Sequence, residues 1–426
     1  MAQVTEARGS RAPARRRGWL GDWNSAVTSY YLLVGATTIL VILGLVMVLS
    51  ASSVDSIHDS GNAYKKFLPQ LVYAIAGLVV VIVASRLPVS FYRRAAWPVF
   101  VGSLLLACLV FLPGFGLDAE GGNRAWIKLG PVRGQPSEFV KLGLALWLGL
   151  VLGRKQRLLG QLRHVLVPGV IGVGLAVGLV LAGKDLGTAL VLLLIVAGAY
   201  WVAGTDWRIF AVAGAGAVAV VAVAVLGQAS GDRVGRIRDT YGPCVDTLND
   251  CYQSLHGMYG LATGGWTGVG LGASREKWRY LPAADNDYIF SVTGEELGLL
   301  GTLVVLGLYT VLGVAMLRIV RNHLDPFVQI ATAGIACWIV GQAFINIGVV
   351  IGLLPVIGVP LPLMSSGGSA LVAAMAALGV VISFARSEPG AAEALAARPS
   401  VARRSFSVMS GAVRRVPLRR SRRSRA

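Results

Sequence analysis

The sequence predicts an all-α polytopic membrane protein with about ten transmembrane helices and a large extracytoplasmic loop between helices 7 and 8. Two observations predict this fold class. First, 55% of the 426 residues are apolar, only 14% are charged and the mean hydropathy is +0.67, whereas a soluble domain usually carries about 25% charged residues. Second, apolar runs of roughly 17–25 residues recur along the chain, and this length lets a helix cross a bilayer. Together they exclude a water-soluble enzyme of this size.

The apolar runs place the helices in order along the chain. They are expected at Tyr30–Ser50, Pro69–Ser85, Trp97–Leu112, Phe139–Gly153, Val165–Ala182, Leu186–Ala203, Ile209–Leu226, Ile289–Leu317, Phe327–Leu354 and Ser369–Phe384. An even number of spans returns both ends of the chain to the same side of the membrane.

Basic residues predict the orientation. Most of the net charge of +18 lies at the two ends, with five Arg in residues 1–17 and eleven in residues 386–426. With both termini cytoplasmic, the tails and inner loops hold 26 Lys and Arg and the short outer loops hold 6, in accord with the positive-inside rule. Segments 1–28 and 386–426 are predicted to be disordered basic cytoplasmic tails that lie against anionic membrane lipids. Nucleic-acid binding is the weaker interpretation, and no nucleic-acid partner is expected.

The loop between Gly227 and Asp287 is about sixty residues long, much longer than the other connections. Loops of this length are usually functional or disordered. A disordered linker would not normally contain Trp266, Trp278 and Tyr280, so we expect an ordered loop. Its Gly-rich stretch, 257–272, is no dinucleotide-binding motif, because it follows no strand and opens no βαβ unit.

Charged residues inside apolar spans are costly and mark candidate sites. Glu138 and Lys141 share one helix face and would form either an interfacial ion pair that orients the helix or the wall of a cavity for a polar headgroup. Glu295 and Glu296 lie about two turns into the eighth helix. Adjacent residues point about 100° apart, so only one of the two can face a given cavity.

The four cysteines fall into two groups. Cys108 and Cys337 lie within spans and are interpreted as small apolar core residues. Cys244 and Cys251 both lie in the long outer loop, where an oxidising surface would allow a possible disulfide between them. No zinc-type pairing accompanies them, so no tightly bound cofactor is expected.

Four segments resemble the SEDS family of peptidoglycan glycosyltransferases. They are Tyr259–Gly301, Asn123–Leu142 (NRAWIKLGPVRGQPSEFVKL), Asp185–Leu190 (DLGTAL) and Leu361–Val372 (LPLMSSGGSALV). The resemblance covers Tyr30–Arg386, so residues 29–385 are interpreted as a SEDS membrane domain in which 227–287 is the catalytic loop. Met47–Ser52 and Gly352–Ser369 resemble the division members, the FtsW type, more than the elongation members, the RodA type. A location at the division septum would follow.

The chain also departs from the family pattern. Where the family usually has Glu-Ala-His-Thr between Leu-Pro and the catalytic-loop Asp, this sequence has Ala283, Ala284, Asp285 and Asn286. The usual Glu and His are therefore absent, and an essential role for those two side chains is in doubt here. Lys184 also replaces a family proline before Asp185.

The resemblance implies polymerisation of lipid II, a lipid-linked disaccharide-peptide, into glycan strands at the outer face of the membrane. The attacking sugar hydroxyl needs a general base. Asp287 matches the family Asp and is the predicted catalytic base. Its alternative role is an N-cap of the eighth helix, since Asp is a favoured cap residue. Asp285 is the local alternative base.

The departing lipid pyrophosphate requires cationic groups or a metal ion. Arg124 and Lys277 are favoured, because both fall on family motif positions. The other candidates are Lys128, Arg236, Arg238 and Arg279. A divalent cation, Mg²⁺ or Mn²⁺, could bridge Asp287 and the pyrophosphate, although no complete ligand set is recognisable.

Two polyprenyl tails must stay in lipid while their headgroups react, which implies a groove between helices. Its polar upper wall is assigned to a small set of substrate-binding candidates: Glu138, Lys141, Glu295, Ser365 and Ser366. The run Ser365–Gly368 could also present backbone amides to a phosphate, or it could be only a tight turn.

The implied partners are lipid II, membrane lipids, and a class B penicillin-binding protein that acts as the septal transpeptidase together with other division proteins. The main rival function is a transporter that flips lipid II, since intramembrane charges and broken helices also fit a transporter. An elongation-type polymerase is a further alternative, and a division scaffold is another.

Overall fold

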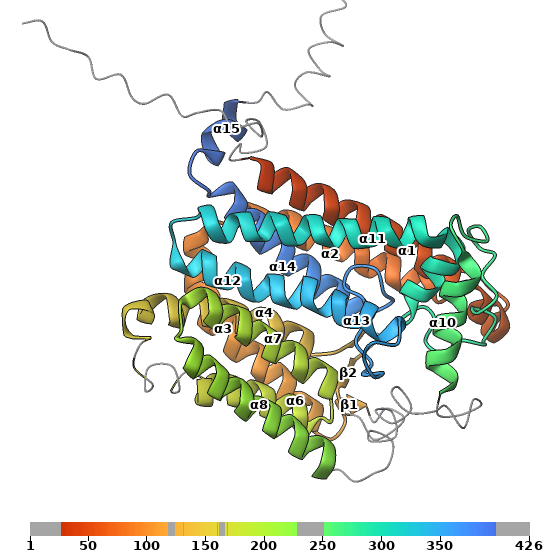
Figure 1. Ribbon diagram of the computed structural model, residues 1–426, viewed down its shortest axis with the longest axis horizontal. Helices are drawn as coiled ribbons and strands as arrows, with labels where there is room; N and C mark the ends of the chain where they lie inside the picture. Colours follow the sequence, from red (N-terminus) through yellow and green to blue (C-terminus); the bar gives the residue numbers. More distant parts are fainter. Residues whose placement is uncertain are drawn as a thin grey trace, which may run out of the picture.

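The computed structural model describes residues 27–117, 124–130, 132–159, 161, 167, 169–227 and 251–397. Long helices run roughly side by side and form an elongated bundle (Figure 1). The first half contains α1 (Thr28–Ser60), α2 (Phe67–Arg86), α3 (Val89–Cys108), η1 (Leu109–Phe111), α4 (Ser137–Lys155), η2 (Gln156–Leu158), η3 (Gly169–Val173), α6 (Gly174–Ala182), α7 (Leu186–Ala203) and α8 (Trp207–Gly227). The second half contains α10 (Tyr252–Gly264), α11 (Ile289–Asn322), α12 (Pro326–Ala336), η4 (Cys337–Gly341), α13 (Gln342–Val350), α14 (Gly368–Arg386) and α15 (Ala391–Ala397).

Each of the ten predicted apolar runs overlaps a helix, so the predicted polytopic helical class is confirmed. Seven described helices are long and apolar enough to cross a membrane, and residues 171–182 form a shorter apolar helix. The other two runs correspond to α4, which packs against α3, α7 and α12, and α8, which packs against α7.

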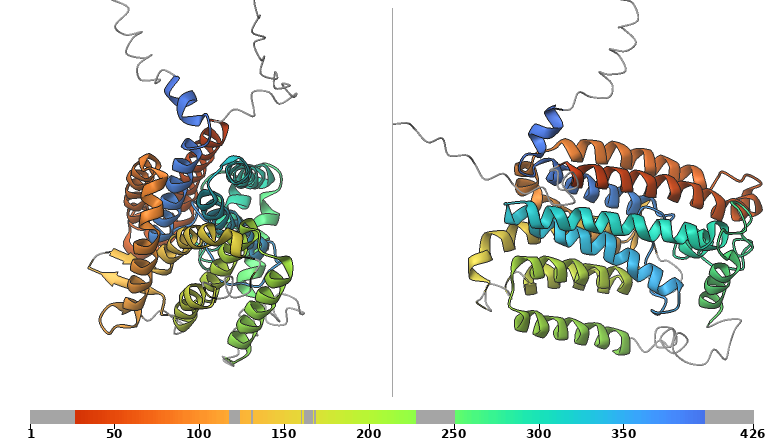
Figure 2. Two further views of the ribbon diagram at one scale, coloured as in Figure 1. Left: turned by 90° about the vertical axis from the view of Figure 1, so that its left-hand side faces the viewer. Right: turned by 45° about the horizontal axis from the view of Figure 1, so that its top comes forward.

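The two ends of the bundle differ in their architecture. At one end, which we call the loop end, lie α10 and the connections around it; at the other, which we call the terminus end, α1 begins and α15 follows α14 (Figures 1 and 2). Local signals set several helix boundaries. Asp185 caps α7 by accepting a hydrogen bond from the backbone N–H of Thr188, and Asp325 caps α12 in the same way with Pro326 in the first turn.

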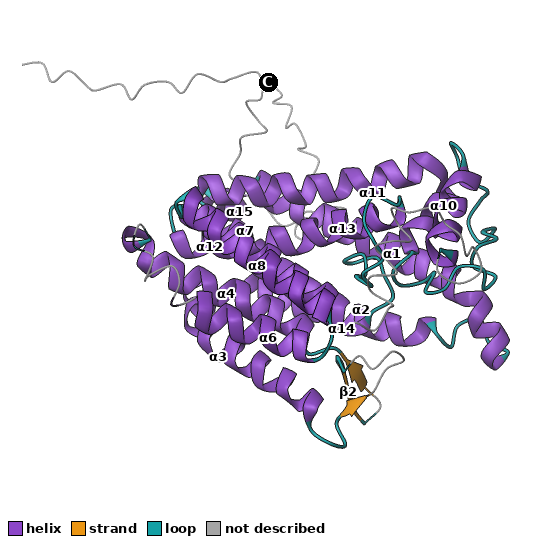
Figure 3. Ribbon diagram, turned by 60° about the horizontal axis from the view of Figure 1, so that its bottom comes forward, coloured by secondary structure: helices purple, strands orange, loops and turns teal. Residues whose placement is uncertain are grey.

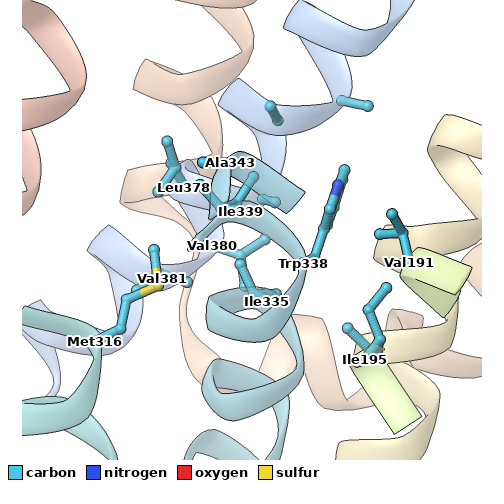
Figure 4. Close-up of a cluster of buried hydrophobic side chains, with 14 of the residues drawn as sticks. Val191, Ile195, Met316, Ile335, Trp338, Ile339, Ala343, Leu378, Val380 and Val381 are labelled. Carbon is cyan, nitrogen blue, oxygen red and sulfur yellow. The ribbon is translucent and has the colours of Figure 1, made fainter. Parts of the chain in front are cut away.

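The apolar core is centred on the continuous helix formed by α12, η4 and α13. Trp338 and Ile339 in η4 are buried among Val191 of α7, Met316 of α11 and the inner face of α14 (Figure 4). Because the surrounding helices all contact this central helix, its position fixes the residues at its loop end, Gln342 and Asn346.

The structure departs from the predicted fold in three places. A small antiparallel sheet, β1 (Gly116–Leu117), β2 (Trp126–Leu129) and β3 (Val132–Gly134), lies at the loop end (Figure 3), so the purely helical prediction was incomplete. Helix α1 continues ten residues beyond its predicted end at Ser50. Helix α15 lies inside segment 386–426, which was predicted to be a tail.

Candidate active site

The predicted base, Asp287, lies at the loop end immediately before α11. Tyr288 is the N-cap residue of that helix, so Asp287 does not occupy the cap position that was its alternative role. The backbone carbonyl of Asp287 accepts a hydrogen bond of 2.7 Å from the Asn346 side chain, which also donates to the Val359 carbonyl at 2.8 Å. Its carboxylate lies against the backbone of Gly358, where an added Cβ would begin 3.6 Å from Oδ2. Asp287 is thereby held between α13 and the connection that follows it.

The run Ser365–Gly368 holds the acidic segment, Asp285–Asp287, in place. The Ser366 N–H donates to the Asp285 carbonyl at 2.8 Å, and the Ser365 hydroxyl donates to the Asn286 carbonyl at 2.6 Å. The Gly367 N–H donates to the Gln70 side chain at 3.2 Å. The amides of Ser366 and Gly367 therefore already have protein acceptors, and a contact between this run and a phosphate stays a prediction. The run Ser365–Gly368, which we call the clamp, joins α2 to the segment Asp285–Asp287.

Asp285, the alternative base, is half-buried like Asp287. Burial raises the pKa of its carboxyl, with Asp55 adding to the rise and with Ser366 and Lys66 opposing it. The turn that contains it begins at Ala283, whose φ is +53°, and both Asn286 and Tyr288 donate back to the Ala283 carbonyl. A left-handed alanine costs roughly 1–2 kcal/mol, and the clamp residues hold the turn in this conformation.

Glu295 and Glu296 are both 1% exposed but contact different groups, as the angle between adjacent helical positions requires. The Glu295 carboxylate accepts hydrogen bonds from the Ser274 hydroxyl and from the Arg275 N–H at 2.8 Å. It therefore holds the loop before the acidic segment instead of facing a substrate groove.

Glu296 forms a buried ion pair with Lys277. The Lys277 ammonium lies 3.0 Å from Glu296 Oε1 and also donates to the Ser50 hydroxyl at 3.0 Å and the Gly272 carbonyl at 2.7 Å. Lys277 is 4% exposed. The structure thus places this favoured pyrophosphate ligand in an internal ion pair that links α1, the loop and α11.

Helix α11 is broken at Gly298, whose φ and ψ are 68° and −166°. The Gly-rich loop supplies the missing backbone partners: Val269 N–H donates to the Glu295 carbonyl at 2.9 Å, and Leu299 N–H donates to the Gly265 carbonyl at 2.9 Å. An added Cβ at Gly268 would lie 2.1 Å from the Glu296 carbonyl oxygen, so only glycine fits there. Broken membrane helices need such substitute partners.

The Glu138–Lys141 pair lies inside the bundle. The Lys141 ammonium is 2.7 Å from Glu138 Oε1, with both side chains at most 3% exposed, and it donates to Gln342 Oε1 at 3.2 Å. Trp338 donates to the same oxygen, and Gln342 donates to the Pro360 carbonyl at 2.8 Å. The pair is therefore buried in the bundle, and it connects α4 to the central helix beside a narrow cavity lined by Glu138 and Ser365.

Arg124 and Lys128 lie on or beside the sheet, and both are exposed. The Arg124 N–H donates to the Gly183 carbonyl at 3.0 Å. Gln135, just after β3, donates to Asp185 at 2.6 Å. Among the favoured cations, Arg124 is thus the one whose side chain lies at the surface.

Sequence reasoning missed two groups at the loop end. The first is the set of buried amides Gln70, Gln342 and Asn346, which an uncharged polar residue in an apolar run could have signalled. The second is a surface cluster in which Arg279 approaches Asp55 at 3.8 Å and Lys66 pairs with Asp59 at 2.8 Å. The acidic members lie on the part of α1 that was predicted to be loop.

Several predicted residues cannot be placed. Arg236, Arg238 and Cys244 lie outside the described residues. Cys251 is disulfide-bonded and buried at the start of α10, and its pairing with Cys244 stays a prediction. Within the described ranges, no three His, Cys, Asp or Glu side chains are grouped so that they could hold a metal ion.

The chain is similar to known proteins along most of its length. The family model described as "Cell cycle protein", which covers FtsW, RodA and SpoVE, matches residues 30–389. The chain belongs to this family. Among its FtsW/RodA/SpoVE relatives, the probable peptidoglycan glycosyltransferase FtsW of Mycobacterium tuberculosis is 40% identical over 390 residues, which are 91% of this chain and 73% of the relative. The protein of the same name from Halorhodospira halophila is 36% identical over 379 residues, covering 87% of this chain and 93% of the relative.

Two solved members of the FtsW/RodA/SpoVE family have a similar fold. A chain from the structure titled "Structural coordination of polymerization and crosslinking by a peptidoglycan synthase complex" matches with a TM-score of 0.67 and 29% identity, covering 83% of this chain and 96% of that one. Rod shape determining protein RodA of Thermus thermophilus matches with a TM-score of 0.61 and 27% identity, covering 84% and 97%. The resemblance drawn from the motifs is thereby confirmed at the level of family and fold.

Proposed function

We propose that this protein polymerises lipid II into peptidoglycan glycan strands at the outer face of the cytoplasmic membrane, with Asp287 as general base. The family match over residues 30–389 and the FtsW relatives named as probable peptidoglycan glycosyltransferases support this activity. Those relatives also favour a role in septal rather than elongation synthesis.

The observation that carries the proposal is the way Asp287 is held. A general base must lie within hydrogen-bond reach of the proton it removes, and small displacements are costly. The Asn346 bond to Asp287 and the clamp from Ser365 and Ser366 fix the backbone on both sides of the carboxylate. The base takes the proton of the attacking sugar hydroxyl as the new glycosidic bond forms and the lipid pyrophosphate departs with the electrons of the broken C–O bond.

Negative charge develops on the departing pyrophosphate. We assign its stabilisation to surface cations at the loop end, with Arg124 first, because a guanidinium binds phosphate oxygens bidentately. Lys277 and the Glu138–Lys141 pair would hold the surrounding helices and loop in position through their buried ion pairs. A divalent cation would have to be shared between Asp287 and the pyrophosphate. Polymerisation in EDTA, followed by addition of Mg²⁺ or Mn²⁺, tests that requirement directly.

The proposed partner is a class B penicillin-binding protein. One solved relative belongs to a peptidoglycan synthase complex that coordinates polymerisation and crosslinking. A shared mode of assembly would place a transpeptidase beside this chain. The proposed topology puts the loop end outside and both termini in the cytoplasm, with the septum as the site of action.

Polymerisation of labelled lipid II by the purified chain with its cognate transpeptidase tests the central claim. Asp287→Asn keeps the shape of the side chain and removes the base, so we expect a 10²- to 10⁴-fold lower rate. Asp285→Asn is the matched control and should retain glycan synthesis. If the two variants lose activity equally at matched folded amounts, the assignment of Asp287 is wrong.

The same preparation separates the enzyme from a lipid II flippase. The buried charged side chains of the described residues lie near the loop end, apart from His323 and Glu388 near the terminus end, whereas a flippase needs polar groups reachable from both sides. Reconstituted vesicles that move lipid II across the bilayer, while the intact complex makes no strands, would favour the transporter.

A further inference from the structure

A cavity of about 570 Å³ opens at the terminus end, between the α2–α3 corner and the last turn of α14, with α15 on one side. Its polar lining includes Arg86, Arg386 and the hydroxyls of Ser383 and Ser387. Leu87, Val89 and Leu395 provide apolar walls. None of the described residues that line it is acidic. The cavity lies at the opposite end of the bundle from Asp287.

One of the two arginines of the cavity, Arg386, is held in place by a hydrogen bond. Arg386 donates to the Ser85 carbonyl at 2.8 Å, and the Ser383 hydroxyl donates to the Leu87 carbonyl at 2.5 Å. These bonds join the end of α14 to the α2–α3 corner. A guanidinium has five N–H donors, so Arg386 keeps donors for an anion while its position is fixed.

The exposed face of α2 leads to this cavity. Leu68, Val72, Ile75, Val79 and Ile82 are all at least 43% exposed, and their spacing of four and three residues places them on one helix face. Arg86 follows at the next position of the same series. In a membrane this stripe contacts acyl chains, and it ends at a cation on the cavity rim.

We propose that this cavity binds the headgroup of an anionic glycerophospholipid whose acyl chains lie along α2. The apolar stripe and the paired arginines match the two halves of such a lipid, and basic pockets between helices on the cytoplasmic side are suited to anionic headgroups. The chain's own C-terminal segment is a poor occupant, because residues 398–426 contain ten arginines and no acidic residue. The inference rests on the proposed topology but not on the proposed glycosyltransferase activity.

Native mass spectrometry of the purified full chain tests the proposal. The chain is titrated with phosphatidylglycerol or with phosphatidylcholine of the same acyl composition. We expect preferential retention of phosphatidylglycerol. The double variant Arg86→Gln and Arg386→Gln should lower this retention about 30-fold, because each basic residue near an anionic lipid surface contributes roughly fivefold. Glutamine at 386 keeps an N–H donor for the Ser85 carbonyl.

The matched control removes two exposed arginines near the same end that do not line the cavity, through Arg154→Gln with Arg321→Gln. It should retain phosphatidylglycerol like the unchanged chain. Equal losses in both double variants, or equal retention of the two lipids by the unchanged chain, would overturn the proposal. Displacement of the lipid by millimolar inorganic phosphate would also overturn it and assign a general phosphate site.

A second measurement does not depend on the variants. Photoreactive phosphatidylglycerol should crosslink to peptides that contain residues 85–89 or 383–395 in the unchanged protein. Crosslinks spread over the bundle without enrichment there would contradict the site. Neither readout requires lipid II, so a failure here is distinguishable from a failure of the proposed polymerase activity.

Discussion

The loop end and the apolar centre of the bundle are stabilised in different ways. At the loop end, buried polar atoms join segments far apart in sequence: Ser50 with Glu296, Gln70 with Gly367, and Asn346 with Asp287. At the centre, Ile339 and its neighbours fill space with apolar contacts that have no single partner. Directional bonds fix a position, whereas apolar packing tolerates small changes in shape. Substitutions at the loop end should therefore lower stability and activity more than substitutions at the apolar centre.

The largest expected effect on stability comes from breaking the buried ion pair. Lys277→Met keeps similar volume but leaves Glu296 buried without its cation, and loss of one partner of such a pair typically costs 3–5 kcal/mol. Thermal unfolding in detergent, followed by reaction of the partly buried free thiol of Cys337, measures the change.

Two comparisons sharpen this prediction. Ile339→Val at the apolar centre should cost only about 0.5–1.5 kcal/mol. Adding Glu296→Gln to Lys277→Met should restore part of the lost stability, because the uncompensated charge is then gone. A Lys277→Met protein as stable as the Ile339→Val protein would contradict the distinction between the two regions.

The next effect concerns activity more than stability. Asn346→Ala removes the side-chain donor to the Asp287 carbonyl, and a misplaced base should lower lipid II polymerisation by about 10²-fold. Ile347→Val, on the adjacent position of α13, is the control and should retain the rate. Rates measured at matched folded amounts decide the matter: an unchanged rate in Asn346→Ala would show that Asn346 does not position the base.

The smallest expected effect is the pH dependence that Asp285 contributes. Burial raises the pKa of this carboxyl above the unfolded value near 3.8, so the folded protein binds the proton more tightly than the unfolded chain. Its contribution to stability is therefore present below the unfolded pKa and is lost as the pH rises through the folded pKa. Asp285→Asn should flatten the dependence of melting temperature on pH above about pH 4, where the unfolded carboxyl ionises before the folded one. If melting temperature changes with pH equally in the unchanged protein and in Asp285→Asn, this account is wrong.

The fold class could be predicted from the sequence because helix formation in a membrane depends on local apolar length. The position of Asp287 at a loop–helix boundary was predictable for the same reason. The sheet at 116–134 was not, since its strands are two to four residues long and carry almost no periodic signal. The break at Gly298 was hidden because the apolar run continues through it.

The partners of the site residues could not be predicted in the same way. Lys277 was favoured as a pyrophosphate ligand because it falls on a family motif position. That position says nothing about Glu296 or Ser50, which approach Lys277 only in the folded bundle. Ser365 and Ser366 looked like phosphate donors until the carbonyls of Asn286 and Asp285 were found opposite them. Spacing along a chain limits which residues can meet, but the choice of partner depends on how helices pack.

The exchange of backbone bonds between residues 265–270 and 295–300 has a consequence for the order of assembly. Residues 265–270 are synthesised before the broken part of α11 whose backbone groups they bond, and only about thirty residues separate the two segments. A contact this local closes quickly. Residues 265–270 and the first part of α11 should therefore associate during synthesis, before α12 to α14 are made. The backbone amides and carbonyls at the break would then have hydrogen-bond partners when the helix enters the lipid.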